Sequence, residues 1–283
     1  KKNVIGMKRF LFIALAALSF VSCREIILED RTECPSHLFF DITNGGSFVD
    51  YDEVYVSVYS HPKDLLLNDG FTRVDAIRDK DFYFSVRGTD AVMGYGLIGC
   101  STLVQNGPVW TLPLGSDYPS LFRFQYLEKV EEESFVVPVE FVKDFCHVTV
   151  QFTGYETFNS VYGLFPFDIV IRGNTNGINA LTGKPERGLF EFSPEETGTG
   201  RFEFNVARLA DNYLLMDIYG RDGIAIDPGF VRTFNLWQEI LSQGGVDWTE
   251  KNLPDVTVNI DYVQWTVYVG RSEERRVGKE CRS

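Results

Sequence analysis

Apolar residues recur at every second position in short segments along most of this 283-residue chain. Val54, Val56 and Val58, for example, share one face of an extended segment, because successive side chains of a strand point to opposite faces. Residues typical of turns, such as Asn44-Gly45-Gly46 and Asp222-Gly223, separate many of these segments. Many short strands with frequent turns are typical of antiparallel sandwiches and barrels, so the pattern predicts an all-β fold.

The remaining predicted strands extend this pattern through both halves of the chain. They lie at residues 38–42, 82–86, 121–126, 135–141, 148–152, 167–171, 189–192, 202–206, 213–219, 256–260 and 265–269. Further turns are predicted at Asp69-Gly70 and Gly173-Asn174, and a single helical turn at Asp64–Leu67. The main helix is predicted at Leu236–Leu241, where Gly244-Gly245 ends it.

The length of the chain leaves room for two domains, because single cores commonly occupy about 100–200 residues. Residues 135–141 have the pattern of a closing strand and residues 148–152 that of a new first strand, so a break is predicted between them. We therefore expect two antiparallel β-sandwich domains in tandem, at residues 36–143 and 144–270. No internal repeat in the sequence is strong enough to indicate a duplication.

The N-terminal segment has the layout of a bacterial lipoprotein signal. Met7-Lys8-Arg9 supplies a basic start, and the apolar segment Phe10–Val21 is too short for a membrane span, which needs about 20 residues. Ser22-Cys23 then places a small residue before a cysteine. We expect removal of residues 1–22, of which 1–6 precede the start methionine, and acylation of Cys23 at the head of a linker, 23–35. An ordinary signal peptide is the alternative.

The last segment, residues 271–283, differs abruptly from the rest of the chain. Its charged string SEERRVGKECRS resembles the translated adapter sequence found at the ends of some reading frames, so it is expected to be artefactual and Cys281 to carry no meaning. Cys34, Cys100 and Cys146 then remain as possible disulfide partners, with at most one bridge among them. An exported protein could form that bridge, but buried free thiols are the favoured prediction.

The sequence offers no constellation that predicts catalysis. The histidines are His37, His61 and His147, and no nucleophile-elbow, zinc-protease or phosphate-loop motif accompanies them. Residues 94–99 match G-x-G-x-x-G by letters, but they lie among strands and turns, so a glycine-rich strand or bulge is predicted there. No spacing of cysteine and histidine suits zinc. We expect no enzyme activity, no cofactor and no metal.

The charge balance argues against nucleic acid as a partner. The chain carries a formal net charge of -13, and residues 23–270 hold 37 acidic but only 18 basic residues. A surface this acidic repels phosphate backbones, so the charge favours solubility or a selected protein partner.

Four aromatic residues gather toward the C-terminus: Trp237, Trp248, Tyr262 and Trp265. Exposed rings of this kind can stack on sugars, whereas buried rings fill a core. Because these four lie among apolar neighbours, core packing is the favoured prediction.

The order of several short motifs resembles that of the FimB-type fimbrial anchoring subunits of Bacteroidales. After Cys23 come a charged stretch, 29–33, and Cys34-Pro35 before the first strand. Phe234-Asn235-Leu236, a short helix and Asp247-Trp248 then precede the final strands. The resemblance covers residues 7–270, and Phe20 departs from the usual leucine of the signal.

The resemblance implies two transthyretin-like sandwiches in an outer-membrane lipoprotein that attaches a fimbrium to the cell and limits its growth. The implied partners are the outer membrane and the fimbrial stalk subunits, joined by strand complementation at an exposed sheet edge. Val256–Ile260 and Trp265–Val269 are expected near that contact. The alternatives are a glycan-binding surface lipoprotein and a tip or stalk subunit cut at Arg24 or Arg31.

Overall fold

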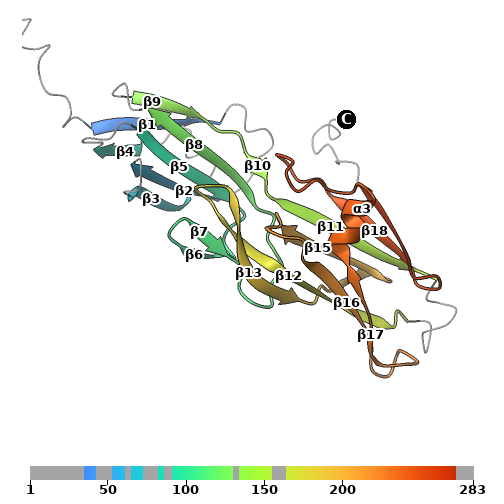
Figure 1. Ribbon diagram of the computed structural model, residues 1–283. Coiled ribbons are helices and arrows are strands. Elements are labelled where there is room, and N and C mark those ends of the chain that lie inside the picture. Colours follow the sequence, from blue (N-terminus) through green and yellow to red (C-terminus); the bar gives the residue numbers. More distant parts are fainter. Residues whose placement is uncertain are drawn as a thin grey trace, which may run out of the picture.

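The computed structural model describes residues 35–42, 53–60, 65–72, 82–85, 91–129, 134–154 and 164–271, which form an elongated arrangement of β-sheets (Figure 1). Strands β1 to β19 and one helix, α3, make up the secondary structure of these residues. The predicted all-β fold with mainly antiparallel sheets is confirmed. No helix within these ranges is both long enough and apolar enough to cross a membrane.

The first half of the described chain forms two facing sheets. One has the order β4 (Phe82–Ser85), β1 (Pro35–Asp41) and β9 (Ser134–Pro138). The other has the order β10 (Val142–Lys143), β8 (Phe122–Lys129), β5 (Ala91–Ile98), β2 (Val54–Ser60) and β3 (Leu65–Thr72). A buried cluster lies between them, in which the rings of Phe40 and Phe124 meet with centroids 5.5 Å apart.

The second half repeats this layered arrangement. One sheet has the order β14 (Glu196–Gly198), β15 (Arg201–Ala207), β11 (Phe145–Thr153), β18 (Val256–Asp261) and β19 (Thr266–Arg271). The other contains β17 (Gly229–Asn235), β16 (Leu214–Gly220), β12 (Phe167–Asn179), β7 (Val109–Thr111) and β6 (Val104–Asn106), with β13 (Lys184–Phe192) on the free side of β12. Phe152 of one sheet packs on Phe167 of the other.

The two halves share one strand connectivity although their sequences show no repeat. In the first, β1 lies between antiparallel β4 and parallel β9. In the second, β11 lies between antiparallel β15 and parallel β18. The opposite sheets contain the orders β3-β2-β5-β8 and β13-β12-β16-β17. In chain order, β2, β3, β5 and β8 of the first half correspond to β12, β13, β16 and β17 of the second.

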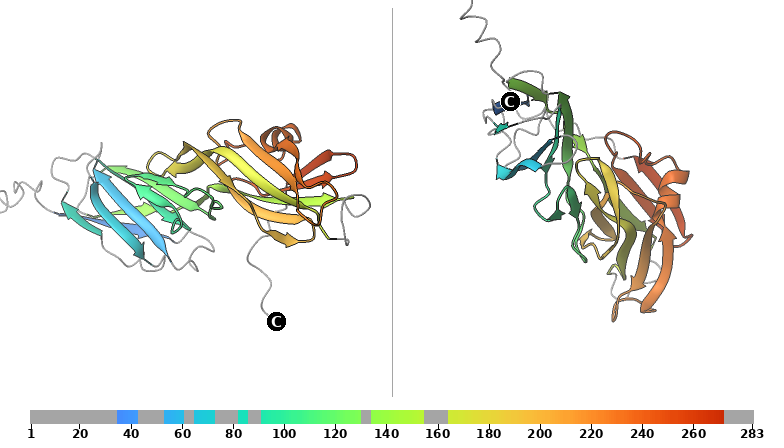
Figure 2. Two further views of the ribbon diagram at one scale, coloured as in Figure 1. Left: turned by 90° about the horizontal axis from the view of Figure 1, so that it is seen from below. Right: turned by 60° about the vertical axis from the view of Figure 1, so that its left-hand side comes forward.

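The hairpin of β6 and β7 connects the two halves. Ile178 of β12 pairs with Trp110 of β7, so that this hairpin extends a sheet of the second half. On its other side Trp110 donates a hydrogen bond from Nε1 to the hydroxyl of Tyr95, and its ring meets Tyr55 edge to face. Figure 2 shows the resulting two lobes side by side. The division at 143/144 stays a prediction, and the pairing of this hairpin crosses it.

Two local predictions were wrong. Residues 65–67 and Asp69-Gly70, expected to form a helical turn and a β-turn, belong to strand β3. Gly173-Asn174, expected to form a turn, lies inside the long strand β12, which has register irregularities there. Gly173 suits this place because a Cβ would lie 2.1 Å from the ring of Phe190. Glycine here permits close approach of a neighbouring ring and does not reverse the chain.

Other local predictions are confirmed. Helix α3 (Leu236–Ser242) begins at Asn235, whose side chain accepts a hydrogen bond from the backbone N–H of Gln238, and Gly244 follows it with φ 72°. The glycine-rich residues 94–98 lie in strand β5, where Gly96 faces the ring of Phe124 at a distance that leaves no room for a Cβ. Residues 94–99 therefore form no strand-to-helix turn for a dinucleotide.

Candidate functional site

The lipidation and disulfide predictions lie partly outside the described residues. Cys23 and Cys34 fall there, and so does His61. Cys100 and Cys146 are buried free thiols, and burial raises the pKa of each to about 12. Both thiols are therefore protonated near neutral pH, which leaves them poor nucleophiles and poor metal ligands.

The described histidines occupy structural positions. In β11, Nδ1 of His147 lies 2.9 Å from Oδ1 of Asn205 on the paired strand β15. His37 lies in β1, next to Ser134 of β9. Across the described ranges, no group of three or more histidine, cysteine and acidic residues is placed to hold a metal ion.

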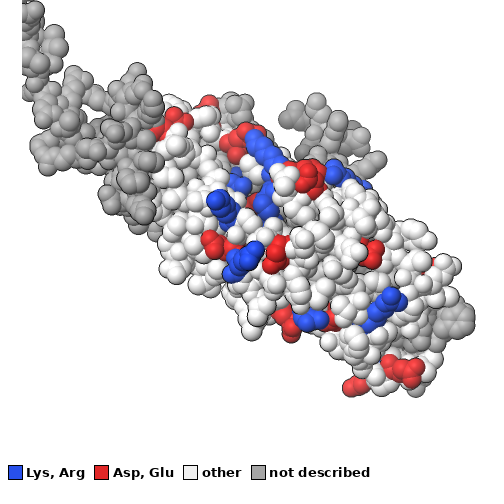
Figure 3. Space-filling view, in the orientation of Figure 1, with Lys and Arg blue, Asp and Glu red and all other residues white. Residues whose placement is uncertain are grey.

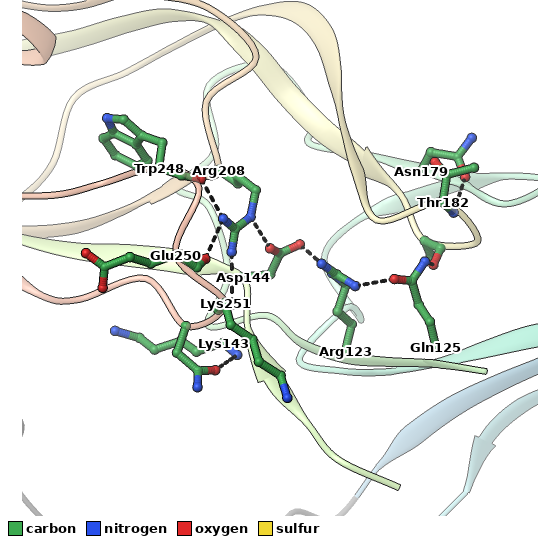
Figure 4. Close-up of polar contacts among 12 residues, drawn as sticks. Arg123, Gln125, Lys143, Asp144, Asn179, Thr182, Arg208, Trp248, Glu250 and Lys251 are labelled. Carbon is green, nitrogen blue, oxygen red and sulfur yellow. Dashed lines mark hydrogen bonds and ion pairs between the residues drawn. The ribbon is translucent and has the colours of Figure 1, made fainter. Parts of the chain in front are cut away.

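A buried carboxylate joins the two halves of the molecule. Asp144, whose side chain is 1% exposed, lies between β10 and β11. Its Oδ2 accepts a hydrogen bond from Nε of Arg123 on β8 at 3.0 Å, and its Oδ1 accepts one from Nε of Arg208 at 2.8 Å (Figure 4). Because two guanidinium groups share one buried carboxylate, the charge is compensated and every element in the cluster is held in place.

The two arginines extend this network into loops that follow much later in the chain. Arg208 donates to the carbonyl oxygens of Trp248, Glu250 and Lys251 at 2.6–3.1 Å. Arg123 donates to Gln125, whose amide donates to the carbonyl of Ala180 beyond β12. The network therefore connects β8 of the first half to three segments of the second, which are Arg208, the loop at residues 248–251 and Ala180.

The C-terminal aromatic residues pack on one another at one side of the second sandwich. The ring of Trp265 lies 4.4 Å from that of Tyr262 and 5.9 Å from that of Phe234, and the guanidinium of Arg232 lies 5.4 Å from its centroid. Trp265 has φ 52°, a backbone conformation that is rare for a bulky residue.

Trp237, Trp248, Tyr262 and Trp265 are all partly buried against the main core. This matches the core-packing prediction. The arginine over Trp265 also occupies a face that a sugar ring would need.

Two of the sheet edges in the second half carry features that discourage pairing with another chain. β13 has two register irregularities, contains Pro185 and displays charged residues. β17 has an irregularity opposite Ile218 and Tyr219. Bulges, prolines and edge charges are the common means by which proteins protect exposed strands.

The edge strand β19 is protected differently. It pairs with β18 in regular register over all six residues. On its free side, the side-chain amide of Gln243 donates to the carbonyl of Val267 at 2.9 Å and accepts from the N–H of Val269 at 2.7 Å. One amide thus takes the place that the backbone of a further strand would occupy. Tyr268 between them is 60% exposed.

A further edge lies in the first half at β9. Its five residues pair in regular register with β1, bear no charge and include Val136, which is 59% exposed. Among the described edge strands without register irregularities, β19 and β9 are the longest, whereas β4, β6 and β10 are shorter.

The described surface mixes both signs of charge. On the face in Figure 3, basic side chains lie beside acidic ones. Elsewhere among the described residues, Arg221 contacts Asp168 at 2.7 Å and Glu196 at 3.0 Å. Such mixed pairs favour solubility and give this face no extended basic patch for a polyanion.

Comparison with known proteins found no matching family model and no matching curated protein. Among solved structures, the chain is similar to the fimbrial anchor protein Mfa2 of Porphyromonas gingivalis, with a TM-score of 0.57 and 11% identity over 83% of this chain and 95% of that one.

Two further solved structures have a comparable likeness. A candidate polysaccharide-binding protein of Bacteroides thetaiotaomicron matches with a TM-score of 0.56 and 12% identity over 86% of this chain and 99% of that one. A candidate adhesin of Bacteroides ovatus matches with a TM-score of 0.55 and 13% identity over 86% of this chain and 93% of that one. At these identities the likeness shows a shared fold.

Asp144→Ala is expected to lower the free energy of unfolding by about 3–5 kcal/mol, because it leaves two largely buried guanidinium groups without their anion. Urea unfolding measures the change. Glu140→Ala, which removes an exposed pair with Lys251, is the control and is expected to cost less than about 1 kcal/mol. Equal losses in the two variants would contradict the role of the junction.

Gln243→Ala is expected to increase self-association, because it exposes the carbonyl of Val267 and the N–H of Val269 on a regular strand edge. Sedimentation velocity over a range of protein concentrations measures the effect. Gln238→Ala, on the exposed surface of the helix α3 that precedes Gln243, is the control. If Gln243→Ala sediments like the wild type at every concentration, the amide does not protect this edge.

Proposed function

We propose that this chain is a lipid-anchored subunit that attaches a fimbrium to the outer membrane and limits its growth. The observation that carries the proposal is the likeness in fold to a fimbrial anchor protein, which extends over 83% of this chain and 95% of that protein. The lipoprotein-type signal that ends at Cys23 agrees with it. A carrier of this kind needs binding surfaces and no catalytic group.

The lipid on Cys23 supplies the hold on the membrane. Each buried methylene contributes about 0.8 kcal/mol, so several acyl chains together keep a protein at a bilayer durably. The chain then passes through the linker to Pro35, where β1 begins. Tension on the fimbrium would reach the membrane through this connection.

Strand complementation at β19 is the proposed contact with the fimbrial stalk. The two segments expected near the partner become β18 and β19, and β18 is paired on both sides, so its backbone groups are already used. The backbone hydrogen bonds on the free side of β19 are made by the amide of Gln243, and helix α3 and Gly245 also contact β19. An incoming strand has to displace this segment and can offer the same hydrogen bonds in its place. β19 also lies in the half of the molecule remote from β1 (Figure 1), which suits a filament that projects from the membrane.

A glycan-binding lipoprotein is the second candidate, supported by the likeness in fold to a candidate polysaccharide-binding protein. A third is a tip or stalk subunit of the same type of pilus. Arg232 packs on the ring of Trp265, which weighs against stacking of a sugar on that ring. Fimbrial anchoring is therefore the function that the geometry supports best.

Cys23→Ala is expected to release fimbriae from cells. The test compares wild type and variant in a fimbriated Bacteroidales host and measures fimbrial protein in the cell and medium fractions. Cys34→Ala, which leaves the anchor intact, is the control. If fimbriae stay on cells that make only Cys23→Ala, the anchoring proposal fails, and polysaccharide-binding assays would then test the second candidate.

Tyr268→Lys is expected to reduce retention of fimbriae while the protein stays folded and membrane-bound, because a lysine on an edge strand discourages pairing. Val136→Lys introduces the same change on β9 at a position of nearly equal exposure and is expected to be neutral. The reverse result would move the contact from β19 to β9. Loss in neither variant would contradict complementation at both edges.

A further inference from the structure

In each half of the molecule the first strand and a late strand are parallel neighbours. β1 pairs with β9 from His37 opposite Ser134 to Asp41 opposite Pro138. β11 pairs with β18 from Val148 opposite Val256 to Thr153 opposite Asp261. All the other pairings among the described strands are antiparallel.

This arrangement decides how a strand pair responds to tension. Where the chain enters by one strand and leaves by its parallel neighbour, entry and exit lie at opposite ends of the pair. Tension then slides the strands along each other and loads all the ladder hydrogen bonds together. In an antiparallel pair, entry and exit lie at the same end, and tension opens the hydrogen bonds one after another.

The two parallel pairs lie along the path from the membrane end to β19. In Figure 1, β1 and β9 run along the length of the first half, and β11 continues in the same general direction through the second. The chain enters at Pro35, leaves β9 at Pro138 and enters β11 at Phe145. The Asp144 network and the β6–β7 hairpin fasten the two halves where these pairs meet.

Buried side chains add resistance to sliding. Leu38 and Phe40 of β1 and Val137 of β9 are at most 2% exposed. The ring of Phe40 packs edge to face on those of both Phe124 and Tyr126, with centroids 5.5 and 5.6 Å away. To slip along β9, β1 must pull these side chains out of their sites in a close-packed core.

We propose that the chain is built to bear tension, with the β1–β9 and β11–β18 pairs acting as two clamps loaded in shear. The inference rests on the proposed anchoring function for the source of the load. It further requires that the partner strand on β19 pull from the turn at residues 262–265, where β18 ends and β19 begins. β19 runs back from this turn, so Arg271 lies beside Val256, and a load at Arg271 peels β19 away.

Single-molecule force spectroscopy on residues 23–283, produced without the signal so that Cys23 keeps a free thiol, tests the inference by changing only the points of attachment. In the shear geometry the handles are on Cys23 and on Val263→Cys, an exposed turn residue. In the first peeling geometry they are on Asp41→Cys and Pro138→Cys, and in the second on Thr153→Cys and Val263→Cys. Each peeling pair joins the same ends of one clamp. Serine replaces Cys34 and Cys281 throughout, and Cys23 in the peeling variants.

The unfolding force in the shear geometry is expected to exceed that in each peeling geometry by at least about twofold, because many ladder bonds break together. Equal forces, or a lower force in shear, would overturn the inference. Circular dichroism and urea unfolding establish that the variants share one fold. The measurement needs no fimbriae. The forces can therefore contradict the two clamps while the Cys23→Ala comparison supports anchoring, or support the clamps while that comparison contradicts anchoring.

Discussion

The buried Asp144 carboxylate is the interaction on which the relation between the two halves depends. A lone carboxylate in this position would be strongly unfavourable, and it is tolerated because Arg123 of β8 and Arg208, just after β15, both pair with it. The hydrogen bonds of Arg208 to three backbone carbonyls then fix the loop that leads into β18. The position of β19 relative to β1 therefore depends on one charge cluster and on the nearby hairpin of β6 and β7.

Local pattern was enough to predict most strands and the helix. Val54, Val56 and Val58 alternate with side chains of the opposite face, and Asn235 begins α3 with a side-chain cap. Prediction failed at β3, because Leu65-Leu66-Leu67 does not alternate and Asp69-Gly70 has the composition of a turn. The neighbouring strand β2 supplies the hydrogen bonds that make this segment extended, and tertiary pairing of this kind overrides local preference.

The features that matter for the candidate site had no local signal. Gln243 reaches residues 24 and 26 positions later, and Arg208 reaches a carboxylate 64 positions earlier. A glutamine just after a helix and an aspartate between two strands are both ordinary in sequence. Only the folded arrangement shows that one completes a strand edge and that the other joins two sandwiches. The shared connectivity of the halves was equally hidden, because it resides in strand order and not in residue identity.

The β6–β7 hairpin has a consequence for how this protein can be dissected. A fragment that begins at residue 144 would lack the strand that pairs with Gly177, Ile178 and Asn179, and the end of β12 would present an unpaired edge. The complementary fragment would retain a hairpin with no sheet to join. In two intact copies, the hairpin of each copy could pair with β12 of the other in the same way. The connection between the two halves is therefore also a site where domain swapping can occur.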